Sequence, residues 1–383
     1  MKRNITFWGI VIALSVSACG NRDVNGRLGD NKYTMLQREN KYFALDSLTT
    51  QETNYIQMID DDRVALYNPP GNTICVFNHH TGSELEKIQL YKEGPHAVRG
   101  IQGFYYHNTD SIWLYQSWEN MLVLVNHKGE IINRNVLREK YNQVSLQQSC
   151  SVSPFPFSDM PIMKWGDWFI LQGMNGPEVK DGFSPACTLL YNICTDEVRL
   201  INEYPTLYGK TSEMNDNWGT FSYRAVPYTI NDEQGMILSF PADDSIRVNN
   251  LIDGTTTCYF AGYSKKHPAR PISGNQKSDL QRHYLEQIQY AGIFYDKYRN
   301  LYYRLALLPI LDYDVNDETT HEKPLSVIIL DSSFSKVGEF DLGKGRYYYR
   351  HSFVAEEGLC INVYSEDDDY LKFITLIPQR NEE

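Results

Sequence analysis

The side chains of this chain that could do chemistry are spread along its length and form no recognised catalytic motif. The sequence contains no G-x-S-x-G, H-E-x-x-H, Walker or G-x-G-x-x-G pattern. Its two acidic runs, residues 60–62 and 366–369, fall at expected turns, where solvated carboxylates are the simplest interpretation. We therefore assign no catalytic residue and expect no cofactor.

One segment begins like a calcium-binding loop. Asp312, Asp314 and Asn316 stand at alternate positions, as the first ligands of such a loop do. The pattern then fails, because Asp317 stands where the sharp turn requires glycine and Lys323 stands where a bidentate glutamate belongs. We therefore expect no metal at this segment.

The thiol of Cys19 has a clearer chemical role. Lys2 and Arg3 precede an apolar stretch, residues 5–18, which is shorter than the roughly twenty residues that a membrane-spanning helix needs. A basic start, a short apolar middle and small residues before a cleavage site are typical of a secretory signal peptide. A chance cysteine after an ordinary signal peptide is the alternative to a dedicated one.

The run Val16-Ser17-Ala18-Cys19 resembles the lipobox of bacterial lipoproteins. This resemblance implies that residues 1–18 are removed, that Cys19 carries diacylglycerol and an N-acyl chain such as palmitate, and that the protein is anchored in a membrane through these lipids. Gly20 follows the cysteine in place of the aspartate of inner-membrane retention signals, so we expect an outer-membrane lipoprotein. Either side of that membrane is possible.

The charge of the chain excludes one class of partner. Its 36 Lys and Arg face 48 Asp and Glu, giving a formal net charge of −12, and loss of Lys2 and Arg3 with the signal would make it −14. Such a surface disfavours nucleic acid, which is bound by clustered cations. The one basic cluster, SKKHPARP at residues 264–271, is interpreted as a solvated loop, with contact to an anionic ligand as the alternative.

Six segments repeat a pattern of polar turn, strand, short gap, second strand and turn. Their first strands begin near Val64, Ile112, Trp168, Met236, Leu301 and Leu359, at a mean spacing of 59 residues. Apolar stretches before and after each pair predict four antiparallel strands per repeat, which is typical of a β-propeller. The 28 tyrosines fit this prediction, since tyrosine favours strands, although it also stacks on sugars. A β-sandwich pair or another large all-β fold is the alternative.

The sequence thus predicts an all-β, six-bladed propeller over residues 32–383, preceded by a lipidated tether at residues 19–31. The last repeat has only three strands, so we expect residues 32–45 to pair with the strands of 359–377 and close the ring. Closure of this kind removes exposed sheet edges. Residues 278–290 are the best candidate for a short helix.

In a propeller, residues that meet at the axis come from different blades, so the lack of a local motif does not exclude an enzyme. Counting back from the first turn of each repeat places several polar residues near the starts of the inner strands, where they would converge on the central channel. These candidate ligand-binding residues are Arg99, Asp159, Arg224, Gln289, Arg350 and His351. Arginine suits carboxylates and phosphates, which predicts an anionic glycan or peptide ligand. Alternatively, each arginine pairs with an acid of another blade.

Together, the lipobox, the repeat number and the segment from Glu93-Gly94-Pro95 to Asn126-His127-Lys128-Gly129 resemble the uncharacterised six-bladed propeller lipoproteins of Gram-negative gut bacteria. The resemblance implies a fold and a location, and no activity. We expect a monomeric, membrane-anchored binding or scaffold module for a glycan, peptide or partner protein. A propeller hydrolase or lyase acting on an extracellular polymer is the alternative, because propellers host both.

Overall fold

The computed structural model describes residues 31–381 except 39, 52, 54, 176–183, 210–213, 215, 216, 220, 266 and 275. The predicted signal peptide, Cys19 and all of the predicted tether but Asn31 lie outside the described residues.

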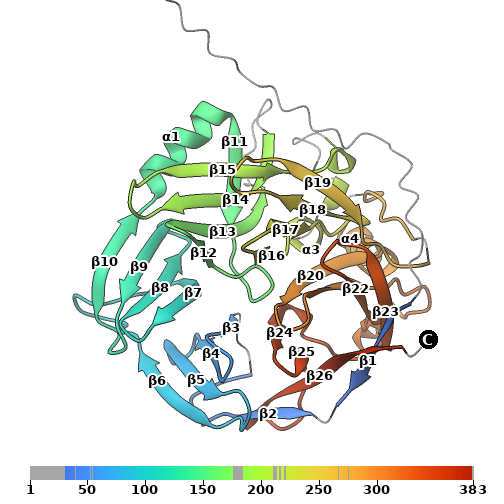
Figure 1. Cartoon of the computed structure of the whole chain (residues 1–383), viewed down its shortest axis with the longest axis horizontal. Helices are drawn as coiled ribbons and strands as arrows, with labels where there is room; N and C mark the ends of the chain where they lie inside the picture. The colour runs from blue at the N-terminus through green and yellow to red at the C-terminus, as the bar shows by residue number, and fades with distance from the viewer. Residues whose placement is uncertain are drawn as a thin grey trace, which may run out of the picture.

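Four sheets follow one another around a central axis (Figure 1). The first contains β3 (Ile56–Met58), β4 (Arg63–Asn68), β5 (Thr73–Asn78) and β6 (Glu84–Gln89). The second contains β7 (Ile101–Asn108), β8 (Ser111–Gln116), β9 (Met121–Val125) and β10 (Ile131–Val136). The third contains β11 (Cys150–Pro154), β12 (Met163–Trp165), β13 (Trp168–Asn175), β14 (Ser184–Asn192) and β15 (Val198–Glu203). The fourth contains β16 (Tyr228–Asn231), β17 (Gly235–Ser239), β18 (Ser245–Asn249) and β19 (Thr256–Phe260).

The remaining strands form a single nine-stranded sheet built from both ends of the described chain. Its C-terminal members are β20 (Gln289–Asp296), β21 (Leu301–Leu307), β22 (Leu325–Leu330), β23 (Lys336–Gly343), β24 (Phe353–Ala355), β25 (Gly358–Val363) and β26 (Tyr370–Arg380). Its N-terminal members are β1 (Tyr33–Gln37) and β2 (Lys41–Ala44). Its terminal strands β20 and β24 lie in contact, so the sheet curls nearly into a barrel.

The prediction of a six-bladed propeller with four antiparallel strands in every blade is therefore wrong. Four sheets stand as separate blades, and the third has five strands, including a parallel pairing of β11 with β14. The last two predicted repeats merge because β1 pairs antiparallel with β26 and also forms a parallel bridge to β23 at Tyr33 and Gly338. The all-β, propeller-like arrangement itself is as predicted.

The expected pairing of residues 32–45 with the last strands is confirmed. Both β1 and β2 pair antiparallel with β26, β2 beginning at the register Lys41 to Phe373. The N-terminal strands thus cover an edge that β26 would otherwise expose, and an exposed edge invites association with other chains.

Hydrophobic packing explains which strands lie inside. Every residue of β22 is buried, and so is nearly every residue of β5 and β9, as expected of apolar runs covered on both faces. The outer strands β6 and β10 carry mostly exposed or half-buried polar side chains, and none of the residues of β19 is fully buried. Strands with continuous apolar runs in the sequence are therefore buried, and strands with polar residues lie at the surface.

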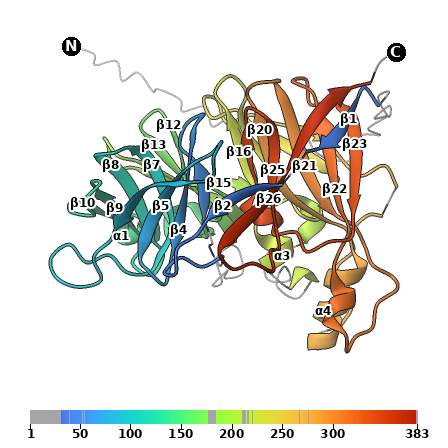
Figure 2. The same ribbon diagram turned by 90° about the horizontal axis from the view of Figure 1, so that it is seen from below.

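Helices interrupt the strand pattern at several places among the described residues. The predicted helix is α4 (Lys277–Glu286), and α3 (Phe221–Arg224) projects from the same side of the ring, opposite the C-terminus (Figure 2). The longest helix, α1 (Arg138–Gln148), was not predicted, because none of its residues is buried and it has no apolar stripe to recognise. Short 3-10 turns include η3 (Tyr349–His351).

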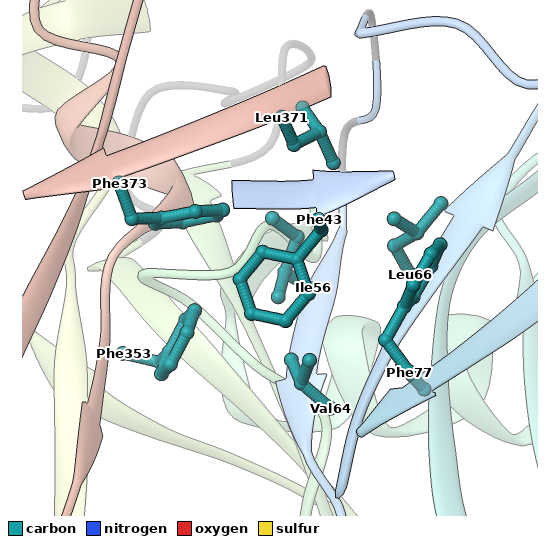
Figure 3. Close-up of a pocket in the computed structure, with 9 residues that line it drawn as sticks. Phe43, Ile56, Val64, Leu66, Phe77, Phe353, Leu371 and Phe373 are labelled. Carbon is teal, nitrogen blue, oxygen red and sulfur yellow. The ribbon is translucent and has the colours of Figure 1, made fainter. Parts of the chain in front are cut away.

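The junction between the first sheet and the part of the nine-stranded sheet formed by β2 and β24–β26 is called the seam. Figure 3 shows the ring of Phe43, from β2, between side chains of these two sheets. Its ring centroid lies 5.3 Å from that of Phe373 and 5.8 Å from that of Phe77. The cavity left here is about 10 Å³ and apolar, so the contact is dry and closely packed.

Candidate functional site

The centre of the ring is occupied by residues 155–162, which we call the axial segment. This segment joins β11 to β12 and reaches the innermost strands of several other sheets. The amide of Ile162 donates to the Tyr55 hydroxyl at 2.6 Å, and the amide of Ile56 donates to the Ser158 hydroxyl at 2.8 Å, so the first sheet is bound here. The Tyr228 hydroxyl, from the fourth sheet, donates to the carbonyl of Pro161 at 2.6 Å.

The axial segment also fills the space beside two further sheets. A Cβ atom placed on Gly103 of β7 would lie 2.8 Å from Pro156, and one placed on Gly292 of β20 would lie 3.5 Å from Asp159. Ser158, Asp159, Met160 and Ile162 are buried. The axial segment therefore fills the central channel, where catalytic residues of different blades could have met.

Asp159 and Arg350, two of the predicted ligand-binding residues, meet across this centre. Nη1 of Arg350 lies 3.5 Å from Oδ2 of Asp159, whose side chain is fully buried. The other carboxylate oxygen, Oδ1, has no hydrogen-bond partner among the described residues. Burial raises the pKa of the Asp159 carboxyl, and the opposing effect of Arg350 is smaller.

Aromatic rings surround the Arg350 guanidinium. Its central carbon lies 4.8 Å from the ring centroid of Phe221 in α3, 5.5 Å from that of Phe157 and 5.6 Å from that of Tyr349. Phe155 packs against Phe157 and Phe221 in turn. Such cation–π contacts stabilise a partly desolvated guanidinium. Sequence reasoning missed these rings, because phenylalanines in the run Ser153-Pro154-Phe155-Pro156-Phe157 are typical of any apolar core.

Three more of the predicted ligand-binding residues lie near α3 or next to Arg350. They are Gln289, Arg224 and His351. Nε2 of Gln289 donates to the carbonyl of Ser222 in α3 at 2.8 Å. The carbonyl of Arg224, at the end of α3, accepts a hydrogen bond from Tyr204, and burial lowers the pKa of this arginine. His351 follows Arg350, and burial lowers the pKa of its imidazole to about 4. Gln289 and Arg224 are thus tied to α3 and its surroundings, and His351 lies next to Arg350 in the chain.

Arg99 does not join this group. It is exposed, and its Nε donates to the carbonyl of Lys92 at 2.7 Å within the loop before β7. The arginines therefore do not converge on one point: Arg350 pairs with an acid of another sheet, Arg224 is held in α3, and Arg99 lies elsewhere. Binding of a ligand by these residues stays a prediction.

An open polar hollow lies beside α4 on the side of the ring that carries both helices, and we call it the α4 pocket. It has a volume of about 220 Å³ and is lined by His267, Pro268, Arg270, Glu286, Gln287 and Ile288. Its two walls are tied together, since the amide of Arg270 donates to Oε1 of Gln287 at 3.1 Å and Nε2 of His283 contacts the carbonyl of Arg270 at 2.6 Å. The side chain of Arg270 is exposed.

Lys323 supports the floor of this pocket. Its buried ammonium donates to the carbonyls of Tyr284 at 2.6 Å and Gln287 at 2.5 Å, and burial lowers its pKa to about 7. The residue that breaks the calcium-loop pattern therefore fixes the C-terminal end of α4. The Tyr313 hydroxyl donates to Oε1 of Glu286, another residue of the pocket lining, at 2.9 Å.

A family model described as a domain of unknown function, DUF4221, matches residues 32–341. The chain belongs to the DUF4221 family. A DUF4221 structure from Bacteroides vulgatus is 23% identical, with a TM-score of 0.74 over 92% of this chain and 100% of that one. A candidate exported protein from Bacteroides fragilis is 10% identical, with a TM-score of 0.54 over 94% of this chain and 98% of that one. These likenesses show the fold.

No curated protein matches this DUF4221 chain. Within the part of the chain that the structure describes, none of the helices has the length and apolar character needed to cross a bilayer.

Proposed function

We propose that this DUF4221 protein is a lipid-anchored binding module of the cell envelope, with no catalytic activity, that holds an anionic ligand in the α4 pocket. The observation that carries this proposal is the contrast between the filled ring centre and the open hollow beside α4. At the centre, Asp159 and Arg350 neutralise each other. At the α4 pocket, His267 and Arg270 are exposed to solvent.

The lining of the α4 pocket suits a small acidic sugar. Arg270 presents a planar fork that binds a carboxylate through two hydrogen bonds, and His267 supplies a second basic group. Glu286 supplies acceptor oxygens for hydroxyl groups. The volume of about 220 Å³ is below the roughly 300–1,000 Å³ of pockets that enclose drug-sized ligands, so a single acidic residue of a glycan fits better than a long chain.

Binding is tested with the chain from residue 20 onward and a panel of uronic acids and matched neutral sugars, by isothermal titration calorimetry. We expect uronic acids to bind and Arg270→Ala to weaken that binding at least tenfold. Arg282→Ala is the matched control, since Arg282 is a 59% exposed arginine of α4 and does not line the pocket. Equal affinity for neutral sugars, or full binding by Arg270→Ala, would contradict the site.

The same titrations separate the other candidates. Loss of binding in Arg350→Ala with an unchanged fold would move the ligand to the ring centre. Release of shortened products from an acidic polysaccharide, detected by chromatography, would show a hydrolase or lyase.

The location is argued from the lipobox, and the candidate exported protein of similar fold from Bacteroides fragilis agrees with it. Cys19→Ser removes the predicted acceptor of the lipid, so we expect the protein to move from the membrane fraction to the soluble fraction. A variant that stays in the membrane pellet would exclude anchoring through Cys19.

A further inference from the structure

A cluster of polar side chains lies at the seam, far from the α4 pocket in the sequence. It contains Lys41 of β2, His79 and His80 after β5, and Glu357 before β25, and we call it the seam cluster. Nε2 of His79 lies 2.9 Å from Oε2 of Glu357, and Nδ1 of His80 lies 3.2 Å from Oε1. The Lys41 ammonium lies 2.8 Å from Nε2 of His79 and 3.1 Å from Oε1 of Glu357.

The hydrogen bonds at His79 cannot all be satisfied. Its Nε2 carries either a proton or a lone pair, so it can donate to Glu357 or accept from Lys41, and not both. Whichever form is present, one contact of 2.8 or 2.9 Å joins two donors or two acceptors. The side chain of His79 is fully buried, so water cannot relieve the conflict.

His80 shows a related conflict. Its Nε2 lies 3.1 Å from Oδ1 of Asp62, an arrangement in which the ring N–H donates to the carboxylate. In the neutral ring this leaves the lone pair of Nδ1 directed at Oε1 of Glu357, which also has only lone pairs. A carboxylate that holds the outer nitrogen of a histidine in this way is the usual partner of a metal-binding imidazole.

We propose that the seam cluster is a binding site for a divalent transition metal, with Zn²⁺ as the best fit, and that Lys41 occupies the cation position when no metal is bound. The ligands are Nε2 of His79, Nδ1 of His80 and the carboxylate of Glu357, one atom from each of which lies within 4.8 Å of the others. A metal between them turns each acceptor–acceptor contact into two coordinate bonds.

The distances and ligand types fit zinc. Zinc–nitrogen and zinc–oxygen bonds of about 2.0–2.2 Å in tetrahedral geometry place neighbouring ligand atoms about 3.3 Å apart. The observed 2.9 and 3.2 Å need only small movements of exposed side-chain ends, since Glu357 is 29% and His80 44% exposed. Two imidazoles and one carboxylate favour zinc over calcium or magnesium, which prefer oxygen ligands.

A metal here would connect two ends of the described chain. His79 and His80 belong to the first sheet, whereas Glu357 belongs to the nine-stranded sheet, 278 residues from His79. Lys41 is 16% exposed on β2, and its flexible stem lets the ammonium swing into solvent when a metal enters. The metal would therefore add to the closure of the ring.

The test uses Zn²⁺ alone and the chain from residue 20 onward, titrated against a chromophoric zinc chelator. We expect one Zn²⁺ per chain and a rise in the melting temperature when it binds. Glu357→Gln and His80→Gln should each weaken binding at least tenfold. Lys41→Met should strengthen it about tenfold, because it removes the competing cation.

His127→Gln is the matched control, since His127 is also 44% exposed and lies 3.1 Å from a carboxylate, that of Asp110, outside the seam. Circular dichroism of each variant checks that it folds. Absence of zinc binding in both the wild type and Lys41→Met would overturn the proposal. Binding that survives both Glu357→Gln and His80→Gln would overturn it as well, because the metal would then lie elsewhere. Neither result depends on the sugar ligand of the α4 pocket.

Discussion

The seam and the junction between the first and second sheets are built around the same contact. At the seam, Gly82 in the turn before β6 approaches the backbone of β2, so that a Cβ atom would lie 1.8 Å from the carbonyl oxygen of Tyr42. At the other junction, Gly129 in the turn before β10 approaches β6, and a Cβ atom would lie 2.1 Å from the carbonyl oxygen of Gln89. Both glycines have positive φ, +71° and +73°. Strand β2 therefore takes the place beside the first sheet that β6 takes beside the second.

The two junctions differ in what surrounds this contact. The first and second sheets follow each other in the chain, and β10 is held to the segment between them by the amide of Ile131, which donates to Nδ1 of His96 at 3.0 Å. At the seam, the partners come from opposite ends of the described chain, and Lys41, His79, His80 and Glu357 lie together there. Closing a loop of this length costs conformational entropy, which side-chain contacts at the seam help to offset. Both junctions share the backbone contact at a glycine. At the seam, where no short chain segment connects the two sheets, charged side chains add to that contact.

Among the changes that test this comparison, deleting residues 20–45 should destabilise the protein most. The deletion removes β1 and β2, exposes the edge of β26 and takes Phe43 out of the seam. Domains have a total stability of only about 5–15 kcal/mol, so losing two strands and a core aromatic should leave a product that is insoluble or lacks a cooperative melting transition. Deleting residues 20–31 alone is the control and should leave melting unchanged. Normal melting of the longer deletion would show that the N-terminal strands do not close the ring.

The ion pair between Asp159 and Arg350 lies at the ring centre and belongs to neither of the two junctions, so breaking it tests a separate contact between sheets. Asp159→Ala leaves Arg350 without its carboxylate, and removing one partner of a buried ion pair costs about 3–5 kcal/mol. Urea unfolding measures the loss. Glu197→Ala provides the comparison, because its pair with Arg199 is 45–51% exposed and should contribute less than about 1 kcal/mol. Similar losses in the two variants would mean that the central pair does not hold the sheets together.

Gly82→Ala and Gly129→Ala test the shared backbone contact directly. Each places a methyl group against a carbonyl oxygen and forces a non-glycine residue to positive φ, which alone costs about 1–3 kcal/mol. Gly254→Ala is the matched control, since Gly254 has φ of +72° and no atom within 4 Å of its added Cβ. Thermal and urea unfolding should show larger losses at Gly82 and Gly129 than at Gly254. Equal losses at all three would mean that backbone strain alone, without the junction contact, accounts for the effect.

The smallest effect at neutral pH is expected from His351, which lies at the ring centre beside Arg350 and stacks on Tyr348. Burial lowers the pKa of His351 from its usual 6.5 to about 4, so between these values the unfolded chain binds a proton that the folded chain does not. Its contribution to stability is therefore fully present above pH 6.5 and is lost as the pH falls toward 4. His351→Gln should reduce the slope of unfolding free energy against pH in this window. An identical slope in wild type and His351→Gln would exclude His351 as the source.

The helix at α4 and the strand contribution of residues 32–45 were predictable, because each depends on a short local pattern or on a count of strands within one repeat. Helix α1 was not, since none of its residues is fully buried and its sequence carries no clear apolar stripe. Of the six candidate residues, Asp159 and Arg350 pair at the ring centre, and Gln289 contacts the Ser222 carbonyl of α3. The axial segment that fills the same space could not be foreseen, because Ser158 and Pro161 bind other sheets through hydroxyl and carbonyl groups that carry no sequence preference.

The sequence by itself determined that this DUF4221 chain is an all-β, propeller-like molecule with apolar strands inside and polar strands outside, because alternation and apolar runs are local properties. Only the tertiary structure decided how many sheets form and what meets at their junctions. Whether β1 pairs with β26 alone or also reaches β23 separates six blades from four blades and a nine-stranded sheet, and this choice depends on contacts between residues 33 and 338. The seam cluster has the same origin, since Lys41, His79 and Glu357 become neighbours only when the ring closes.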